Sequence, residues 1–273
     1  MIGSNLIRCI FSRNFLNKIK HALGWETDYW FELEKISQIP RCQPAKTNLV
    51  IPGLQFIDSE SFINQYIEIF EKKSLHFDTN KKTPRILDCG SNIGLSIIFF
   101  KNLYPDSNIT GFEPDPKVFA ILAKNLNSYL SNDLEIINKA VWHEETSLLF
   151  SPDNADGGTI DENGMIEVKT VNLNDYLTEK IDFLKIDIEG AEHNVLPSIV
   201  DRLCNIKFLF LEVHLDNDKP DQIEKIFQIL RENNFRYSFN TVKNITFKEL
   251  VDSAKLNHMF DQQLNIFAVN ENS

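Results

Sequence analysis

The chain has 273 residues, of which 42% are hydrophobic and 25% are charged, and this composition excludes an intrinsically disordered protein. Its 39 Asp and Glu residues outnumber its 28 Lys and Arg residues, which gives a formal net charge of −11. Because proteins that bind DNA or RNA usually carry a basic face, this acidic balance argues against a nucleic-acid partner.

The first 24 residues are predicted to form a basic amphipathic helix. They contain four Lys and Arg residues and no acid, and apolar residues recur near helical spacing. Such a helix could dock on an anionic membrane surface or on a partner. The alternative, a helix packed on its own domain with its cations in water, is favoured, because four charges contribute only about 1 kcal/mol each to membrane binding.

The next part of the chain is expected to be a loop followed by a helix. Residues 38–53 hold three prolines and a glycine, which are typical of a loop. Apolar residues at intervals of three and four over residues 62–70 predict an amphipathic helix. Polar residues 73–84 mark the start of the main domain, so we divide the chain into an N-terminal helical extension, residues 1–78, and a main domain, residues 79–273.

Beyond residue 84, short apolar runs alternate with amphipathic segments. Seven runs are predicted to be strands: 85–88, 108–113, 134–141, 181–187, 207–213, 235–240 and 264–269. Helices are expected over 94–103, from Asp115-Pro116 onward, from about residue 190, and over 221–233. Asp115 can accept hydrogen bonds as the N-cap, and Pro116 suits the first helical position. Strands that alternate with helices predict an α/β fold with a doubly wound, mostly parallel seven-stranded sheet.

Two further strands, 147–151 and 166–171, are expected to pair around a loop rich in Gly and Asp. This loop, residues 152–165, could be a lid that orders over a substrate, or it could be an ordinary hairpin loop.

The cysteines and the apolar segments indicate a cytoplasmic protein. The four cysteines lie far apart, and their spacing matches neither a zinc site nor a disulfide framework, so we expect reduced thiols. No apolar run reaches the roughly 18–20 residues of a membrane span. The N-terminus lacks the apolar block and the cleavage site of a signal peptide.

The first predicted strand of the main domain ends in a glycine motif. Residues 88–94 have the spacing DxGxxxG. Gly90 permits a tight turn where a side chain would collide with a ligand, and Gly94 lets the following helix sit close to the strand. Backbone N–H groups of this turn are expected to face the ligand. The acid that opens the motif, Asp88, would repel a phosphate but suits a cationic ligand that carries an amino-acid group.

A second acid follows the next predicted strand. Glu113 lies 25 positions after Asp88 (113 − 88), and a carboxylate at this place can accept both hydroxyls of a ribose. Taken alone, Asp88 could be a helix-capping acid and Glu113 a solvated turn residue. Because each closes a strand and precedes a helix, the pair predicts nucleoside binding.

These motifs resemble those of a known enzyme family. The stretches that carry the resemblance are ILDCGSNIGLS, GFEPDP, NKAVW, VKTVNLNDYL, FLKIDIEGAEHNVL and FLFLEVH, in this order over residues 85–240. They resemble the FkbM-type methyltransferases, which are class I, Rossmann-like enzymes that use S-adenosylmethionine. The sequence departs from the family at Cys89, where an aliphatic residue is more usual, and in its first 78 residues, which match no family known to us.

The resemblance implies a set of cofactor-binding residues. Asp88, Gly90, Asn92 and Gly94 would line the methionine part of S-adenosylmethionine, and Glu113 would hold its ribose. Residues near Ala140 and Val141 would flank the adenine. Further candidates for cofactor binding are Ser91, Pro114 and Asp187.

Catalytic candidates follow the fourth and fifth strands of the predicted sheet. They are Asp187 and Glu189 after the fourth strand, and Glu212 and His214 at the fifth. Because neighbouring strands lie about 4.8 Å apart, these groups could converge. Methyl transfer requires alignment of the acceptor oxygen and a group that takes its proton. His214 is the strongest candidate base, because its ordinary pKa lies near 6.5, and Asp187 is the next.

Other interpretations of these residues stay open. His214 could be an ordinary loop histidine, and Glu192 is expected to cap the helix from about 190 rather than to act in catalysis. Asp187, Glu212 and His214 could instead bind a divalent cation such as Mg²⁺, although no metal site is predicted.

The resemblance implies transfer of a methyl group from S-adenosylmethionine to a hydroxyl of a sugar, a glycan or a natural product. An enzyme that methylates nitrogen would often carry Asp/Asn-Pro-Pro-Tyr after the fourth strand, where this chain has Asp-Ile-Glu-Gly. A nicotinamide dehydrogenase would need the pattern GxGxxG, whose first glycine is missing here. A non-catalytic module that binds the cofactor or a glycan remains the alternative.

Overall fold

The computed structural model describes residues 29–272 apart from residues 154–157, 161, 216–220 and 242–261. The helix predicted over the first 24 residues, and with it the membrane contact considered for that helix, lies outside the described residues. The predicted lid, residues 152–165, is described only in part, because residues 154–157 and 161 are among these gaps.

The main sheet has seven strands. They are β3 (Arg85–Cys89), β4 (Asn108–Phe112), β5 (Leu134–Ile137), β10 (Ile181–Ile186), β11 (Ile206–Leu215), β12 (Phe235–Thr241) and β13 (Gln262–Asn270). Their order is β12-β13-β11-β10-β3-β4-β5. The strands from β11 to β5 are parallel, whereas β13 runs antiparallel to both β11 and β12.

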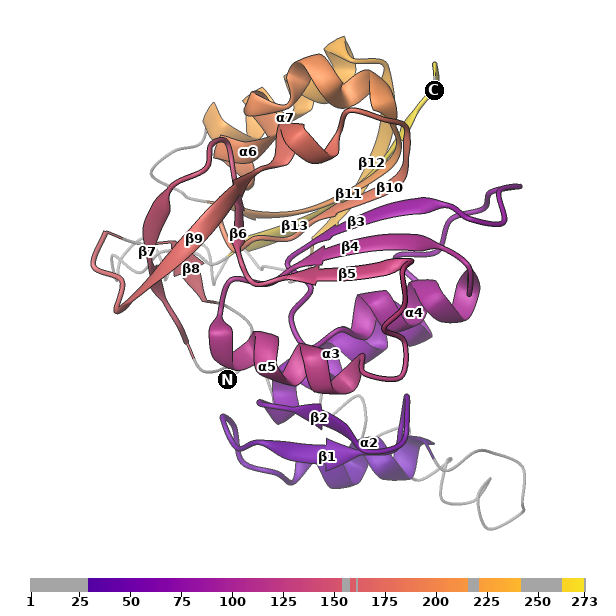
Figure 1. Cartoon of the computed structure of the whole chain (residues 1–273), viewed down its shortest axis with the longest axis vertical. Coiled ribbons are helices and arrows are strands. Elements are labelled where there is room, and N and C mark those ends of the chain that lie inside the picture. Colours follow the sequence, from indigo (N-terminus) through magenta and orange to yellow (C-terminus); the bar gives the residue numbers. More distant parts are fainter. Residues whose placement is uncertain (1–28, 154–157, 161, 216–220, 242–261, 273) are drawn as a thin grey trace, which may run out of the picture.

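Helices cover both faces of this sheet. They are α4 (Leu95–Leu103), α5 (Pro116–Asn125), α6 (Glu192–Ser198) and α7 (Asp221–Glu232), with short 3₁₀ turns at Leu173–Tyr176 and Val200–Asn205. Figure 1 shows α4 and α5 on one face and α6 and α7 on the other. The predicted doubly wound α/β fold is therefore confirmed. The predicted start of α5 is also confirmed, because the Asp115 side chain accepts a hydrogen bond from the Lys117 N–H (2.7 Å).

One predicted strand, 134–141, is wrong because it is two strands in different sheets. β5 ends at Ile137, and β6 (Ala140–Trp142) joins a second sheet of order β6-β9-β7-β8. The other strands of that sheet are β7 (Ser147–Ser151), β8 (Thr159–Ile160) and β9 (Ile166–Asn172). The chain bends at Asn138, whose side-chain amide donates to the carbonyl oxygens of Glu113 (2.8 Å) and Pro114 (3.0 Å). The predicted pairing of strands 147–151 and 166–171 is confirmed, since β7 and β9 pair antiparallel.

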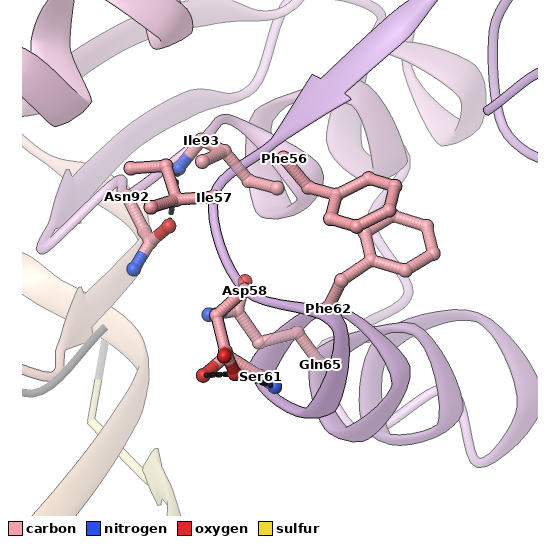
Figure 2. A pocket seen from close by; sticks show the side chains of 8 residues that line it. All are labelled: Phe56, Ile57, Asp58, Ser61, Phe62, Gln65, Asn92 and Ile93. Carbon is pink, nitrogen blue, oxygen red and sulfur yellow. Dashed lines mark hydrogen bonds between the residues drawn. The ribbon is translucent and has the colours of Figure 1, made fainter. Parts of the chain in front are cut away.

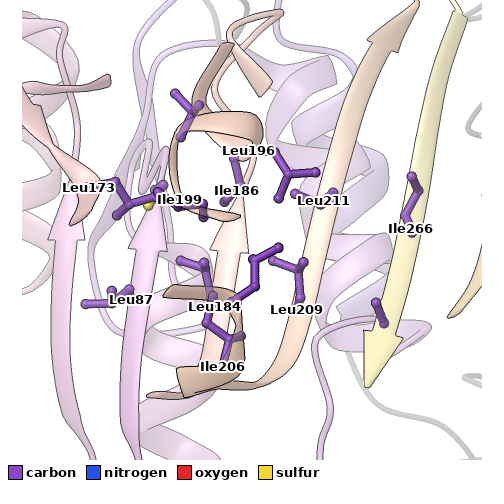
Figure 3. Close-up of a cluster of buried hydrophobic side chains, with 14 of the residues drawn as sticks. Leu87, Leu173, Leu184, Ile186, Leu196, Ile199, Ile206, Leu209, Leu211 and Ile266 are labelled. Atoms are coloured by element: carbon purple, nitrogen blue, oxygen red, sulfur yellow. The ribbon is translucent and has the colours of Figure 1, made fainter. Parts of the chain in front are cut away.

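Two hydrophobic clusters lie on opposite faces of the main sheet. Because successive strand side chains point to opposite faces, β10 contributes Leu184 and Ile186 to the cluster beneath α6 and α7, and Phe183 to the other. Figure 3 shows the first cluster, which is built of Leu and Ile side chains from the strands and α6. The second is rich in phenylalanine, and the ring of Phe183 lies 4.9 Å from that of Phe77. Burial of these apolar side chains on both faces is the main stabilisation of the sheet.

Residues 29–77 pack on the face that carries α4 and α5. They form α2 (Tyr29–Ser37), β1 (Ala45–Thr47), β2 (Leu54–Phe56), α3 (Ser59–Tyr66) and one π-helical turn (Ile67–Glu71). The helix predicted over 62–70 is confirmed, although it begins earlier, at the Asp58 N-cap. The loop predicted over 38–53 contains β1, which pairs antiparallel with β2. Phe56 and Phe62 lie in the same cluster as Ile97 of α4, so this segment shares the core of the main sheet.

Asn125, at the end of α5, joins the N-terminal segment to the glycine motif. Its buried amide donates to the carbonyl oxygens of Gln55 and Ile93 (both 2.9 Å) and accepts from the Gln55 N–H (2.8 Å). Replacement by alanine leaves these backbone groups without partners, so we expect Asn125→Ala to lower the free energy of unfolding by about 2–3 kcal/mol. Urea denaturation measures this loss.

The matched control for this prediction is Asn127→Ala, two residues further on, where the side chain is exposed. We expect the control to change the free energy of unfolding by no more than about 0.5 kcal/mol. Equal losses in the two variants would show that the Asn125 bonds do not join the segments.

The helices of the described residues were also compared with the dimensions of a membrane span. Within residues 29–272, outside the gaps given above, no helix has the length and apolar character needed to cross a bilayer.

Candidate functional site

The carboxyl ends of β3, β4, β10 and β11 meet at one edge of the main sheet. The parallel register places Asp88 of β3 beside Lys185 of β10, and Cys89 beside Phe112 of β4. The segments that follow these strands therefore lie close together. In open α/β sheets, this is the edge at which ligands bind.

The turn after β3 is built from residues in the left-handed backbone region. Gly90, Asn92 and Gly94 have φ values of +86°, +47° and +97°. A Cβ atom on Gly90 would lie 1.8 Å from the carbonyl oxygen of Asp187. The neighbouring strand end therefore requires the glycine, rather than a ligand as we predicted. A Cβ on Gly94 would lie 2.9 Å from Leu122, so this glycine permits close packing against α5 rather than against the preceding strand.

All five backbone N–H groups of residues 90–94 donate within the chain. Their acceptors are the Phe112 carbonyl oxygen for Gly90 (3.1 Å) and Ser91 (2.8 Å), Glu113 Oε2 for Asn92 (3.0 Å), Asn92 Oδ1 for Ile93 (2.7 Å) and the Ser91 carbonyl oxygen for Gly94 (2.9 Å). The prediction that these groups face a ligand is therefore wrong in this structure. The turn offers no free donors of the kind that bind phosphate.

Glu113 connects the turn after β3 with the turn after β4. Its side chain is buried, with 6% of the residue exposed, and Oε1 accepts from the Asp115 N–H (2.9 Å) while Oε2 accepts from Asn92. Burial raises the pKa of this carboxyl to about 8, although both N–H groups oppose the shift. When the carboxyl is ionised, each oxygen keeps a second lone pair that can accept from a ligand hydroxyl. Pro114, next to it, is partly buried, and its carbonyl oxygen accepts from Asn138.

Asp88 points into the protein and not toward open space. It is fully buried, Oδ2 accepts from the Ser96 hydroxyl (2.5 Å), and Oδ1 lies 3.4 Å from Lys185 Nζ. The Ser91 hydroxyl is also buried and donates to the Asp88 carbonyl oxygen (3.0 Å). The side chains of Asp88 and Ser91 therefore hold the glycine motif in place through buried hydrogen bonds and are not exposed to a ligand.

Lys185 is a buried cation that sequence analysis assigned no role. Its Nζ donates to the Gly90 carbonyl oxygen (2.8 Å) and lies 3.0 Å from Asp187 Oδ2. Burial alone would lower the pKa of Lys185, but Asp187 and Asp88 outweigh it and raise the pKa. The ammonium group therefore stays charged and holds the ends of β3 and β10 together. A lysine inside the apolar run FLKID is the signal that could have revealed it.

Carboxylates gather where β10 and β11 end. Asp187, whose side chain is 25% exposed, and Glu212 are both partly buried. Burial, and then the charge of Asp187, raises the pKa of Glu212 well above its usual range. Glu212 pairs across the strands with Asn265 of β13, whose buried Oδ1 has no hydrogen-bond partner among the described residues. Asn265 was missed because only the fold brings β13 beside β11.

His214 lies between two carboxylates. Its Nε2 lies 3.0 Å from Glu189 Oε2, and its Nδ1 lies 3.7 Å from Glu192 Oε1. The side-chain nitrogen of Gln263 on β13, a second residue that sequence analysis missed, lies 2.8 Å from Nε2. Because an amide nitrogen only donates, this contact fits a neutral ring, and a doubly protonated ring requires the Gln263 amide to be turned so that its oxygen faces Nε2. Burial lowers the pKa of His214, but both carboxylates raise it more, and the result is a pKa of about 12. The two carboxylates therefore favour a doubly protonated imidazole, whereas the role as a base that was predicted for His214 requires a neutral one.

The remaining predicted residues are placed as follows. Ala140 and Val141 lie in β6, where both side chains are packed in hydrophobic clusters. The part of the chain that the structure describes contains no three His, Cys, Asp or Glu side chains grouped as metal ligands. The divalent-cation site considered above is therefore not formed, because Asp187, Glu212 and His214 are not grouped as ligands of one ion.

A small pocket borders the glycine motif on the side of the N-terminal segment (Figure 2). It is a shallow depression open to solvent, lined by Phe56, Ile57, Asp58, Ser61, Phe62, Gln65, Asn92 and Ile93. Asp58 is held by Arg41, which lies 3.0 Å from its Oδ2, and it caps α3. Residues 56–65 therefore form a wall beside Asn92, which sequence analysis did not foresee because this segment matches no family known to us.

Comparison with known proteins gave a match to a family model and to several relatives. The model of the methyltransferase FkbM domain matches residues 88–237, which is more than half of the chain. The chain is 27% identical over 157 residues to the 2-O-methyltransferase NoeI of Sinorhizobium fredii, covering 48% of this chain and 64% of that protein. It is 28% identical over 142 residues to the hexuronic acid methyltransferase AglP of Haloferax volcanii, covering 49% and 57%. Both matches span less than two thirds of the relative.

A solved structure was also matched. The crystal structure of methyltransferase FkbM from Methylobacillus flagellatus KT aligns with a TM-score of 0.48 at 14% identity. The alignment covers 74% of this chain and 47% of that one.

Proposed function

Because the chain belongs to the FkbM family of methyltransferases, we propose that it transfers a methyl group from S-adenosylmethionine to a hydroxyl oxygen of a sugar, a glycan or another natural product. The names of two relatives support this choice, since one is a 2-O-methyltransferase and the other a hexuronic acid methyltransferase. The acidic net charge supports an acceptor other than nucleic acid.

The observation that carries the proposal is the chemistry of the strand-end edge. S-adenosylmethionine has a ribose, an ammonium group and a sulfonium group, but no phosphate. The N–H groups of the turn after β3 all donate to acceptors within the chain, whereas the carboxylate of Glu113 can accept further hydrogen bonds from ribose hydroxyls. Asp187 and Glu189 add negative charge that suits a cation. A nicotinamide dehydrogenase would instead need the GxGxxG pattern after β3, whose first glycine is missing here.

We assign the cofactor-binding residues on this basis. Gly90, Asn92 and Gly94 would shape the surface against the methionine part, and Ser91, Asp88 and Lys185 would support it from behind. We keep residues 79–273 as the catalytic domain. Within the N-terminal extension, residues 56–65 would close the cofactor site beside Asn92, because they line the pocket there.

The chain's residues would then act on the acceptor hydroxyl. When bound, S-adenosylmethionine supplies the electrophilic methyl group. Asp187 or Glu189 would take the hydroxyl proton, since both carboxylates are partly exposed and His214 is already protonated. Glu212, which is partly exposed at the same edge, would hold a neighbouring hydroxyl.

Methyl transfer from labelled S-adenosylmethionine tests this function. We expect label in neutral sugars, uronic acids or natural-product alcohols, none in RNA, and a loss in Glu189→Gln or Asp187→Asn. Parallel reactions with Mg²⁺ and with a chelator test the metal alternative. Cofactor binding without transfer to any hydroxyl would favour the non-catalytic module.

The raised pKa of Glu113 predicts that cofactor binding depends on pH. Below about pH 8 the free protein holds a proton on this carboxyl, and ribose hydroxyls that donate to it favour its release. The affinity for S-adenosylhomocysteine should therefore rise as the pH increases, by at most about tenfold per pH unit, and level off above about pH 8. Calorimetric titrations in buffers of different ionisation enthalpy would measure the released proton.

The Glu113→Gln variant tests whether the pH dependence of cofactor binding comes from the Glu113 carboxyl. It removes two charge-assisted hydrogen bonds to the ribose, so we expect about 10- to 100-fold weaker binding that no longer depends on this proton. Glu179→Gln, which alters an exposed carboxylate far from the edge, should bind as the unmodified protein does. The same pH dependence in Glu113→Gln as in the unmodified protein would contradict the assignment.

A further inference from the structure

The turn between β10 and α6 has an unusual backbone. Glu189 and the following Gly190 both lie in the left-handed region, with φ values of +54° and +94°. A glycine adopts this conformation readily, but a glutamate does not. The surrounding structure must therefore hold Glu189 in place, and residues held in this way often mark functional sites.

Glu192, the first residue of α6, holds this turn. Its Oε1 accepts from the Ile188 N–H (2.9 Å), and its Oε2 accepts from the Gly190 N–H (3.1 Å). The carboxylate thus binds the backbone on both sides of Glu189. Only 1% of Glu192 is exposed, so it does not reach a ligand.

The same carboxylate also faces the His214 ring. Glu192 Oε1 lies 3.7 Å from Nδ1, which is buried and has no hydrogen-bond partner among the described residues. Glu189 Oε2 lies 3.0 Å from the other ring nitrogen. Each ring nitrogen of His214 therefore faces a carboxylate. Glu192 supplies one of the two carboxylates, and it holds the backbone of Glu189, which supplies the other.

We infer that Glu192 is a positioning residue, which orients Glu189 through the turn and keeps both ring nitrogens of His214 protonated. This inference rests on the proposed function. It makes His214 a fixed positive charge among carboxylates instead of the group that takes the acceptor proton. The helix-capping role expected from the sequence is wrong, because Ala191 is the N-cap of α6 and Glu192 accepts from N–H groups that precede the helix.

Other groups around His214 do not replace Glu192 in this role. Glu212 lies on the same strand as His214. Its pKa is raised by the charge of Asp187, which follows β10, and lowered by that of Lys185 in β10. Gln263 of β13 is uncharged, and the inference requires its amide to be turned so that the oxygen, not the nitrogen, faces Nε2. Glu189 and Glu192 are the carboxylates paired with the ring.

Nuclear magnetic resonance of the histidine side chains in the full chain tests the inference. We expect the His214 ring nitrogens to stay doubly protonated from about pH 5.5 to 9, with the signal assigned by its loss in His214→Asn. In Glu192→Gln, the amide oxygen still accepts a backbone hydrogen bond but the charge is lost. His214 should then lose a proton within this pH range. Glu224→Gln, an exposed carboxylate of α7, should leave the signal unchanged.

Kinetics provide a second measurement on the same variants. In Glu192→Gln we expect kcat to fall by about 10- to 100-fold with a new pH dependence, while binding of S-adenosylhomocysteine is unchanged. Titration of His214 near pH 6.5 in the unmodified protein, which requires no variant to fold, would overturn the inference. An unaltered His214 titration in folded Glu192→Gln would overturn it too. Absence of cofactor binding by the unmodified protein would refute the proposed function instead, because the histidine titration does not depend on methyl transfer.

Discussion

Gly90→Ala is expected to abolish cofactor binding and to lower the free energy of unfolding by about 3–5 kcal/mol, the sum of backbone strain and overpacking. The backbone at Gly90 has a φ of +86°, and a Cβ there would lie 1.8 Å from the Asp187 carbonyl oxygen. That oxygen belongs to the main chain, so the ends of β3 and β10 would have to separate. Urea denaturation and calorimetric titration with S-adenosylhomocysteine would measure the two effects.

Gly53→Ala is the matched control for Gly90→Ala. Gly53 also has a positive φ, +73°, but no atom lies within 4 Å of a Cβ built there. The control should therefore lose only about 1 kcal/mol from backbone strain and should keep its cofactor affinity. Similar losses in both variants would mean that the contact between β3 and β10 does not determine the shape of the turn.

Lys185→Met is expected to lower the free energy of unfolding by about 3–5 kcal/mol, because it leaves buried carboxylates without their cation. Asp88 Oδ1 and Asp187 Oδ2 would both lose Lys185 Nζ, at 3.4 and 3.0 Å, and the Gly90 carbonyl oxygen would lose its donor. The double variant Asp88→Asn/Lys185→Met should recover part of this loss, because one of the stranded charges is gone. Chemical denaturation of the two single variants and the double variant measures the coupling.

An exposed lysine serves as the control for Lys185→Met. Lys180 donates to the Cys204 carbonyl oxygen (2.8 Å) at the surface. We expect Lys180→Met to change the free energy of unfolding by about 0.5 kcal/mol or less. If the losses in the free energy of unfolding caused by Asp88→Asn and Lys185→Met simply added in the double variant, the buried pair would not be coupled. This description of the edge would then be wrong.

Local patterns in the sequence were sufficient to predict the main elements of the fold. The fully buried strand β10 is an apolar run interrupted only by Asp182 and Lys185, and the start of α5 follows from an Asp–Pro capping signal. The break between β5 and β6 could not be predicted, because it depends on the Asn138 amide, which bonds to the turn after β4, far away in sequence.

The site could be predicted only as a set of positions. The strand-end rule places Asp88, Glu113, Asp187 and His214 at one edge, but it does not say which way their side chains point. Asp88 turns inward to Ser96 and Lys185, a partnership that requires the register of β3 with β10. The protonation of His214 depends on Glu189 and Glu192, which the left-handed turn brings to the ring. Such properties arise from tertiary contacts, which motif spacing does not encode.

Calorimetric titration of the full chain with S-adenosylhomocysteine, in parallel with NAD, tests the central claim most directly. The account predicts one site per chain with micromolar affinity for S-adenosylhomocysteine and no binding of NAD, because the turn after β3 has no free N–H groups for a pyrophosphate. Binding of NAD, or a lack of S-adenosylhomocysteine binding by protein with a cooperative unfolding transition, would contradict the assignment of this edge.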